Sequence, residues 1–202
     1  MVKKRITRLN LIRKLRSLDR GFFTVSDLEK IFGYGREILK VTIYRLVKEG
    51  ILIRLKRGVY QLEFNPVNVE KIANQIYYPS YLSFEGALSR YGILSQIPYT
   101  QTFATPRKSK KMIIMGIEAE FTQIKKELYY GFRYDGGIYI AEPEKALLDQ
   151  LYLASRGLRG ENIDEYDYTA INIKKFKYYS EKFPKQPKFL NLLSMVFDKL
   201  KN

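Results

Sequence analysis

The chain has 202 residues and a formal net charge of +15, and it contains neither Cys nor His. Without those two residue types, disulfides, thiolate or imidazole metal sites and Ser-His or Cys-His nucleophilic catalysis are excluded. No run of about 18 uncharged apolar residues is present, and no apolar signal-peptide core follows the basic N-terminus. We therefore expect a cytoplasmic protein with no membrane partner.

The positive charge is concentrated at the N-terminal end. Residues 1–62 carry 16 Lys and Arg against 5 Asp and Glu, a net charge of +11, which leaves +4 for residues 63–202. Solubilising charge would be spread over the whole surface. A basic excess on one small module is instead typical of a nucleic-acid-binding domain.

Two helices and a tight turn are predicted first. Leu11, Ile12, Leu15 and Leu18 recur at helical spacing, which predicts a helix over residues 6–18. Residues 22–25 are expected to be extended. Ser26 with Glu29 three residues later fits a capping box at the start of a second helix. Gly33-Tyr34-Gly35 then matches the short turn of a helix-turn-helix.

A third helix is predicted over residues 36–49, with four apolar residues spaced to face the core: Leu39, Ile43, Leu46 and Val47. The second helix of a helix-turn-helix enters the major groove with its N-terminal half leading. The residues expected near base edges are Arg36, Glu37, Lys40, Val41 and Tyr44. Arg45 and Lys48 are expected to meet phosphates.

A hairpin follows and completes a winged helix. Residues 51–55 and 59–62 read as strands around Lys56-Arg57-Gly58, where the glycine supplies the positive φ of a tight turn. This wing would carry Lys56 and Arg57 to flanking phosphates or to the minor groove. We therefore predict a winged helix-turn-helix domain over residues 1–64.

Residues 65–202 are predicted to form a mixed α+β domain with a mainly antiparallel sheet and C-terminal helices, so the fold class is α+β. The strands are expected over residues 99–104, 111–115, 119–125, 131–134 and 138–141, with a hairpin turn at Asp135-Gly136-Gly137. Residues 157–168 read as a loop. The expected helices are residues 67–77, a helix starting at Ser83, an amphipathic helix over 144–155, and a final pair over 174–183 and 189–200.

Several polar residues of this domain have a local interpretation. Ser83 is placed to cap a helix and Glu85 lies in its first turn. Glu144 can serve a helix start, and Lys145 with Asp149 is an i,i+4 pair of the kind that contributes a few tenths of a kcal/mol, roughly, on a helix surface. A basic loop either extends a nucleic-acid footprint or is solvated: Arg107, Lys108, Lys110 and Lys111.

Three segments resemble AbiEi-family antitoxins: "RGVY" at residues 57–60, "YPSYLSFEGALSRYGIL" at 78–94 and "YIAEPEKALLDQLYL" at 139–153. The resemblance extends over about residues 22–183. Its characteristic polar residues fall at Ser83, Glu85, Glu144, Lys145 and Asp149. One departure is Gly86, where the family often has Ser or Thr.

The resemblance implies a transcriptional repressor that binds double-stranded operator DNA, regulates its own operon and serves as the antitoxin of a type IV, AbiE-type pair. It also implies a nucleotidyltransferase-like toxin as functional partner, without a stable complex. No cofactor is implied.

Other functions stay open at this stage. The 17 Tyr and 12 Phe offer stacking surfaces, so the second domain could bind RNA or the toxin itself, and a solitary regulator without a toxin would have the same sequence features. A metal nuclease is disfavoured, because Glu144 and Lys145 are adjacent on a helix instead of separated by one residue on a strand. We expect no catalytic and no metal-binding residues.

Overall fold

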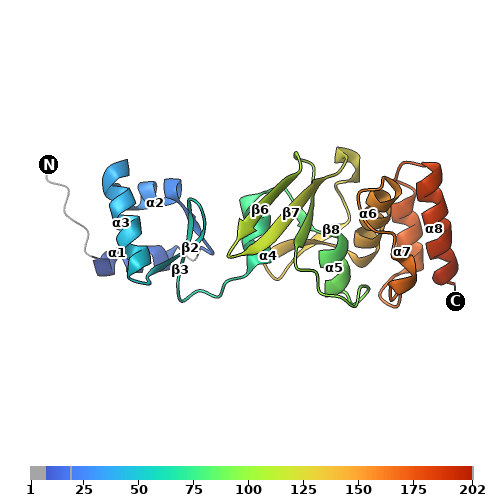
Figure 1. The fold of residues 1–202 in the computed structure, drawn as a ribbon, viewed down its shortest axis with the longest axis horizontal. Coiled ribbons are helices and arrows are strands. Elements are labelled where there is room, and N and C mark those ends of the chain that lie inside the picture. Colours follow the sequence, from blue (N-terminus) through green and yellow to red (C-terminus); the bar gives the residue numbers. More distant parts are fainter. Residues whose placement is uncertain (1–7, 19, 202) are drawn as a thin grey trace. The chain divides into compact units, whose positions relative to one another are not determined.

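The computed structural model describes residues 8–18 and 20–201 (Figure 1). They divide into two compact units. The first comprises residues up to Ile72 together with Ile114–Gly116, and the second comprises Ala73–Ile113 and the described residues from Ile117 onward. The predicted domain boundary after residue 64 stays a prediction.

The first unit is a winged helix, as predicted. Its elements are α1 (Arg8–Ser17), β1 (Phe23–Thr24), α2 (Val25–Phe32), α3 (Arg36–Lys48), β2 (Leu52–Lys56) and β3 (Val59–Leu62). The strands form a small antiparallel sheet in the order β1-β3-β2. The predicted start of the first helix at residue 6 lies outside the described residues. The core is made of residues that the helical periodicity had largely placed inward: Leu11, Leu15, Phe23, Leu28, Phe32, Leu39, Ile43, Leu46, Leu52 and Leu62.

The capping box at the start of α2 differs from the predicted one. Thr24, and not Ser26, is the N-cap: its Oγ1 accepts from the Asp27 amide at 3.1 Å, and the Asp27 carboxylate accepts from the Thr24 amide at 2.8 Å. Ser26 lies inside the helix and is exposed. The shift arises because β1 ends at Thr24, whose extended backbone is the conformation that an N-cap needs.

The second unit is built on a six-stranded sheet, and the α+β prediction is confirmed. Its strands are β4 (Tyr81–Leu82), β5 (Gln101–Thr105), β6 (Lys110–Ile114), β7 (Ile117–Gln123), β8 (Phe132–Asp135) and β9 (Ile138–Ala141), in the order β6-β7-β5-β4-β9-β8. The pairs β4–β5 and β8–β9 are antiparallel, whereas β5–β7 and β4–β9 are parallel. The short β4 was not predicted, and it joins the two halves of the sheet.

Helices complete the second unit: α4 (Val69–Ile76), which begins before the division at Ile72, α5 (Phe84–Arg90), α6 (Pro143–Ser155), α7 (Ile173–Ser180) and α8 (Pro187–Lys199), with 3-10 turns at Lys126–Leu128 and Ile163–Glu165. The α6 helix packs against α5, α7, α8 and β9 (Figure 1). Every residue from Glu144 to Ala154 is buried. The prediction of an amphipathic helix is therefore wrong, because the polar residues of α6 pair with one another and with neighbouring elements inside the protein.

Candidate nucleic-acid interface and the buried polar centre of the second unit

The turn between α2 and α3 fixes where α3 begins. Gly33 ends α2 in the left-handed conformation, with φ +68°, and its amide donates to the Glu29 carbonyl at 2.8 Å. Gly35 is the N-cap of α3, and its carbonyl accepts from the Leu39 amide at 2.9 Å. With the start of α3 set by this turn, Leu39, Ile43 and Leu46 point into the core, and the opposite side of α3 faces solvent.

All of the α3 residues that the sequence nominated for DNA contact are exposed: Arg36, Glu37, Lys40, Val41, Tyr44, Arg45 and Lys48. Glu37 accepts a hydrogen bond from the Lys40 ammonium at 2.8 Å, and this contact holds the pKa of the Glu37 carboxyl below its ordinary value. The exposed face thus combines the Glu37–Lys40 ion pair with three further cations, Arg36, Arg45 and Lys48. Contact of these residues with DNA stays a prediction.

The wing is shorter than predicted. Lys56 is the last residue of β2 and pairs with Val59 of β3, so the turn consists of Arg57 and Gly58 alone. Gly58 has φ +78°, and its carbonyl accepts from the Val25 amide at 3.1 Å, which ties the wing to the start of α2. Arg57 is exposed and Lys56 is half-buried. Of the two predicted wing residues, Arg57 is therefore the better placed for a phosphate.

A charged pair lies in the centre of the second unit. Lys145 and Asp149, one turn apart on α6, have side-chain exposures of 0% and are joined by an ion pair. The Asp149 carboxylate also accepts from the Tyr81 and Ser83 hydroxyls, each at 2.9 Å, and the Lys145 ammonium donates to the Tyr81 oxygen at 2.8 Å. This network ties α6 to β4 and to the residue that precedes α5.

Two local interpretations of these residues are corrected by their burial. Ser83 is the N-cap of α5 by position, but its hydroxyl makes no capping hydrogen bond and donates to Asp149 instead. Lys145 and Asp149 do not form a weak surface pair. Removal of either partner would leave a buried charge unpaired, which is far more costly than loss of a surface pair.

Burial of the network shifts the pKa values of Lys145 and Tyr81. Burial lowers the pKa of the Lys145 ammonium, and the adjacent Asp149 carboxylate opposes that effect. Burial, reinforced by Asp149, raises the pKa of the Tyr81 hydroxyl well above its usual range. The Lys145 ammonium also lies 5.2–5.3 Å from the ring centroids of Tyr81, Tyr130 and Phe183, a distance at which aromatic faces attract a cation.

Gly131 makes room for this lysine. It has φ +70°, and a Cβ at this position would lie 3.1 Å from Lys145 Cγ and 3.2 Å from Tyr179. A side chain here would thus be strained in its backbone and would press on the stem of Lys145. Glycine is required because the chain passes directly over the buried lysine.

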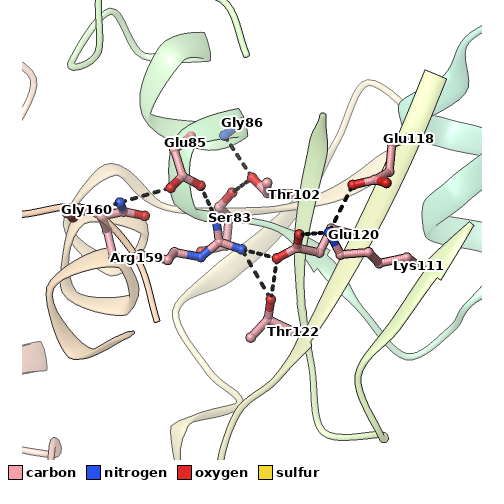
Figure 2. Close-up of polar contacts among 11 residues, drawn as sticks. Ser83, Glu85, Gly86, Thr102, Lys111, Glu118, Glu120, Thr122, Arg159 and Gly160 are labelled. Atoms are coloured by element: carbon pink, nitrogen blue, oxygen red, sulfur yellow. Dashed lines mark hydrogen bonds and ion pairs between the residues drawn. The ribbon is translucent and has the colours of Figure 1, made fainter. Parts of the chain in front are cut away.

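A second polar cluster gathers around Arg159, which the sequence did not nominate (Figure 2). Its guanidinium pairs with Glu85 of α5 and with Glu120 of β7, the latter at 2.8 Å, and it donates to Thr122 at 3.2 Å. Lys111 of β6 pairs with Glu120 from the other side at 3.0 Å. Glu85, a resemblance-based candidate, is therefore engaged in holding the loop after α6 on the sheet.

The two cations of this cluster keep the Glu120 carboxyl ionised. Burial would raise the pKa of the Glu120 carboxyl, but Lys111 and Arg159 outweigh it and hold the pKa below its ordinary range. Arg159 contacts Glu85 across 74 residues of chain. Its only sequence signal was a cation between Gly157 and Gly160 in a loop, which is too common a pattern to identify a partner.

The contacts of Glu144 and Gly86 give both residues a structural role. The Glu144 carboxylate accepts from the Asn172 amide at 2.9 Å and lies 3.9 Å from the Lys175 ammonium, so it joins α6 to the start of α7. Gly86, which departs from the family pattern, packs on β5: a Cβ there would meet the Thr102 hydroxyl at 3.1 Å. Both positions are dictated by packing.

The two sets of candidates are thus physically different. Apart from the half-buried Lys56, the α3 and wing candidates are exposed, and most of them are basic. Ser83, Glu144, Lys145 and Asp149 are buried and cannot touch a macromolecule while the unit is folded. Within residues 8–18 and 20–201, no group of three acidic, Cys or His residues is arranged to hold a metal ion. None of the helices described is long and apolar enough to cross a membrane.

Comparison with known proteins bears on the first unit. Residues 10–62 match the family model described as "Transcriptional regulator, AbiEi antitoxin". The match covers α2, the turn, α3 and the wing, and it ends before the second unit begins. No curated protein matches the chain. Over residues 10–62, the chain is therefore similar to the AbiEi antitoxin transcriptional regulators.

Proposed function

We propose that the protein is a sequence-specific DNA-binding repressor that regulates its own operon. The observation that carries this proposal is the exposed basic face of α3. In the chain, the Gly33–Gly35 turn precedes this helix and the Arg57-Gly58 wing follows it. The N-terminal half of α3 enters the major groove, Arg45 and Lys48 meet phosphates, and Arg57 contacts the flanking backbone.

The antitoxin role is proposed for the second unit. It neutralises a nucleotidyltransferase-like toxin without forming a stable complex with it, and no catalytic step by this chain is part of the proposal. The family match supports an antitoxin, but it covers residues 10–62 only. The cytoplasmic location stays a prediction.

The first experiment compares binding of the full chain to its own upstream DNA and to scrambled DNA of equal length. Fluorescence anisotropy is measured at two salt concentrations. Phosphate contacts displace condensed counterions, so affinity for both duplexes should fall as salt rises. A preference for the upstream duplex that persists at the higher salt is expected. Equal, salt-labile binding to both duplexes would refute a specific autoregulator.

A specific observation supports single-stranded RNA as a second candidate ligand. Tyr78 and Tyr134 are 58% and 64% exposed, and their ring centroids lie 6.0 and 5.1 Å from that of Tyr139. Arg107 donates to the Tyr78 carbonyl at 2.9 Å, so a cation adjoins this tyrosine band. Exposed aromatic rings beside cations stack bases and hold phosphates.

This second candidate is tested with the Tyr78→Ala/Tyr134→Ala variant and a fluorescent single-stranded RNA. If the band binds RNA, the variant should lose affinity for the single strand and keep its affinity for upstream duplex DNA. Unchanged RNA affinity, or no RNA binding by the unaltered protein, would remove this candidate.

A further inference from the structure

The outward face of α3 carries apolar residues where a solvated helix would carry polar ones. Val41 is 50% exposed and Ile38 is 62% exposed. At about 3.6 residues per turn, Leu39, Ile43 and Leu46 define the buried side of α3, and Val41 lies almost directly opposite their centre. A β-branched apolar residue thus occupies the point of α3 farthest from the protein core.

We propose that Val41, flanked by Ile38, recognises the 5-methyl groups of thymines in the major groove of the operator. This inference rests on the proposed function, because it requires α3 to enter the groove. Thymine is the base that presents an apolar group at the major-groove edge, and its methyl is recognised by apolar side chains.

The rest of the α3 sequence fits this assignment. The helix, REILKVTIYRLVK, contains no Asn or Gln, the residue types that bind adenine through two hydrogen bonds. Glu37 and Lys40, beside Val41 on the same face, are paired with each other at 2.8 Å. The polar groups of Glu37 and Lys40 are therefore engaged with each other, and Val41 with Ile38 offers the bases an apolar contact beside this pair.

Cationic residues lie before and after Ile38 and Val41 along α3. Arg36 lies five residues before Val41, and Arg45 and Lys48 lie four and seven residues after it, about one and two turns. Arg45 and Lys48 can hold phosphates and keep the helix in the groove, while Arg36, Ile38 and Val41 face the bases.

The test replaces thymine by uracil. Full-length protein is titrated into two duplexes of its upstream DNA, one containing thymidine and one containing deoxyuridine, which pairs identically and lacks only the 5-methyl group. Affinity should be about fourfold weaker for each methyl that the protein contacts, by the transfer value of one buried methylene. Val41→Ala should weaken binding to the thymidine duplex and reduce the ratio between the two duplexes toward one.

The variant is essential because uracil also changes the deformability of DNA, and the double-mutant comparison isolates the direct contact. Val41 is exposed and alanine favours helices, so the variant should fold. Ile97→Ala, which removes part of an 86% exposed β-branched residue of the second unit, is the matched control and should leave the ratio unchanged.

The outcomes separate the inference from the function on which it rests. If the unaltered protein prefers upstream DNA but binds both duplexes equally, or if Val41→Ala lowers both affinities by the same factor, methyl recognition is refuted and the repressor proposal stands. If the unaltered protein shows no preference for upstream DNA at all, the proposed function itself fails.

Discussion

Lys145 shows how far burial can change the role of a common residue pair. On an exposed helix, lysine and aspartate at i,i+4 contribute little to stability. Here both side chains are fully buried, and the Asp149 carboxylate accepts from three groups that surround it. The pair is tolerated in the core because its charges and hydrogen bonds are satisfied mutually.

We expect Lys145→Met to lower the free energy of unfolding by about 3–5 kcal/mol, because it leaves the Asp149 carboxylate buried without its counterion. Urea denaturation would measure this change. The control is Lys199→Met, which removes an exposed lysine that pairs with Asp164 at 2.8 Å and should cost no more than about 0.5 kcal/mol. Equal stability of the two variants would show that the buried pair does not contribute as a pair of charges.

The tyrosines predict a pH dependence. Burial raises the pKa of Tyr129 and Tyr166 to about 12, and it also raises the pKa of Tyr81 well above its ordinary value. The unfolded chain releases these protons near pH about 10, so between pH about 10 and about 12 the unfolded state binds fewer protons and stability falls as pH rises. Urea denaturation at several pH values should show a constant stability contribution below pH about 10 and a loss above it.

Tyr129→Phe provides the check on this assignment. The variant removes one phenol with a raised pKa, so its stability should fall less steeply with pH than that of the unaltered protein in the same window. Identical slopes in the two proteins would mean that Tyr129 does not contribute to the alkaline transition.

At the scale of elements, substitutions at the start of α2 can show which residue caps this helix, Thr24 or Ser26. Thr24→Ala removes the hydroxyl that accepts from the Asp27 amide and should cost about 1 kcal/mol of unfolding free energy. Ser26→Ala, two residues later on the exposed side of the same helix, should change it by no more than about 0.5 kcal/mol. A larger effect for Ser26 would contradict the cap observed at Thr24.

The two halves of α3 should respond differently to substitution. Arg36→Ala should cost about 1–3 kcal/mol on upstream DNA and less on scrambled DNA, because a base contact carries sequence information. Lys48→Ala should weaken binding to both duplexes alike and reduce the slope of log affinity against log salt by about 1. If both variants acted uniformly on the two duplexes, α3 would contact only the backbone.

At the scale of the whole molecule, charge is divided unevenly along the chain. Residues 1–62 carry a net +11 and residues 63–202 only +4. The buried networks of the second unit engage many of its charged residues with one another, among them Lys145, Arg159, Glu85, Glu120 and Asp149. This division places the electrostatic attraction for DNA mainly in the first unit.

A separation of functions follows. The triple variant Arg36→Ala/Lys40→Ala/Arg57→Ala should abolish repression of an upstream-promoter reporter and retain rescue of cells from the toxin. The control is Lys174→Ala/Lys177→Ala/Lys185→Ala, which removes the same charge from exposed positions of the second unit and should retain repression. Loss of rescue in the first variant would mean that neutralisation depends on DNA binding.

Features that are local in the chain could be predicted from the sequence. Helical spacing of Leu39, Ile43 and Leu46 identified the buried side of α3, glycines marked the turns at Gly33 and Gly58, and the count of Lys and Arg located the basic module. Each of these features depends on residues that are close together in the chain. The same locality produced the error at Ser26, since the pattern could not show where β1 ends.

The tertiary structure decided what depends on distant partners. The parallel pairing of β5 with β7, the complete burial of α6 and the joining of Arg159 to Glu85 arise between segments far apart in the chain. A polar residue buried in such a network has the same local pattern as one in solvent, because only its distant partners compensate its desolvation. For this reason the sequence by itself determined the winged helix and its basic face, and only the folded chain showed that the polar motif of the second unit lies inside its core.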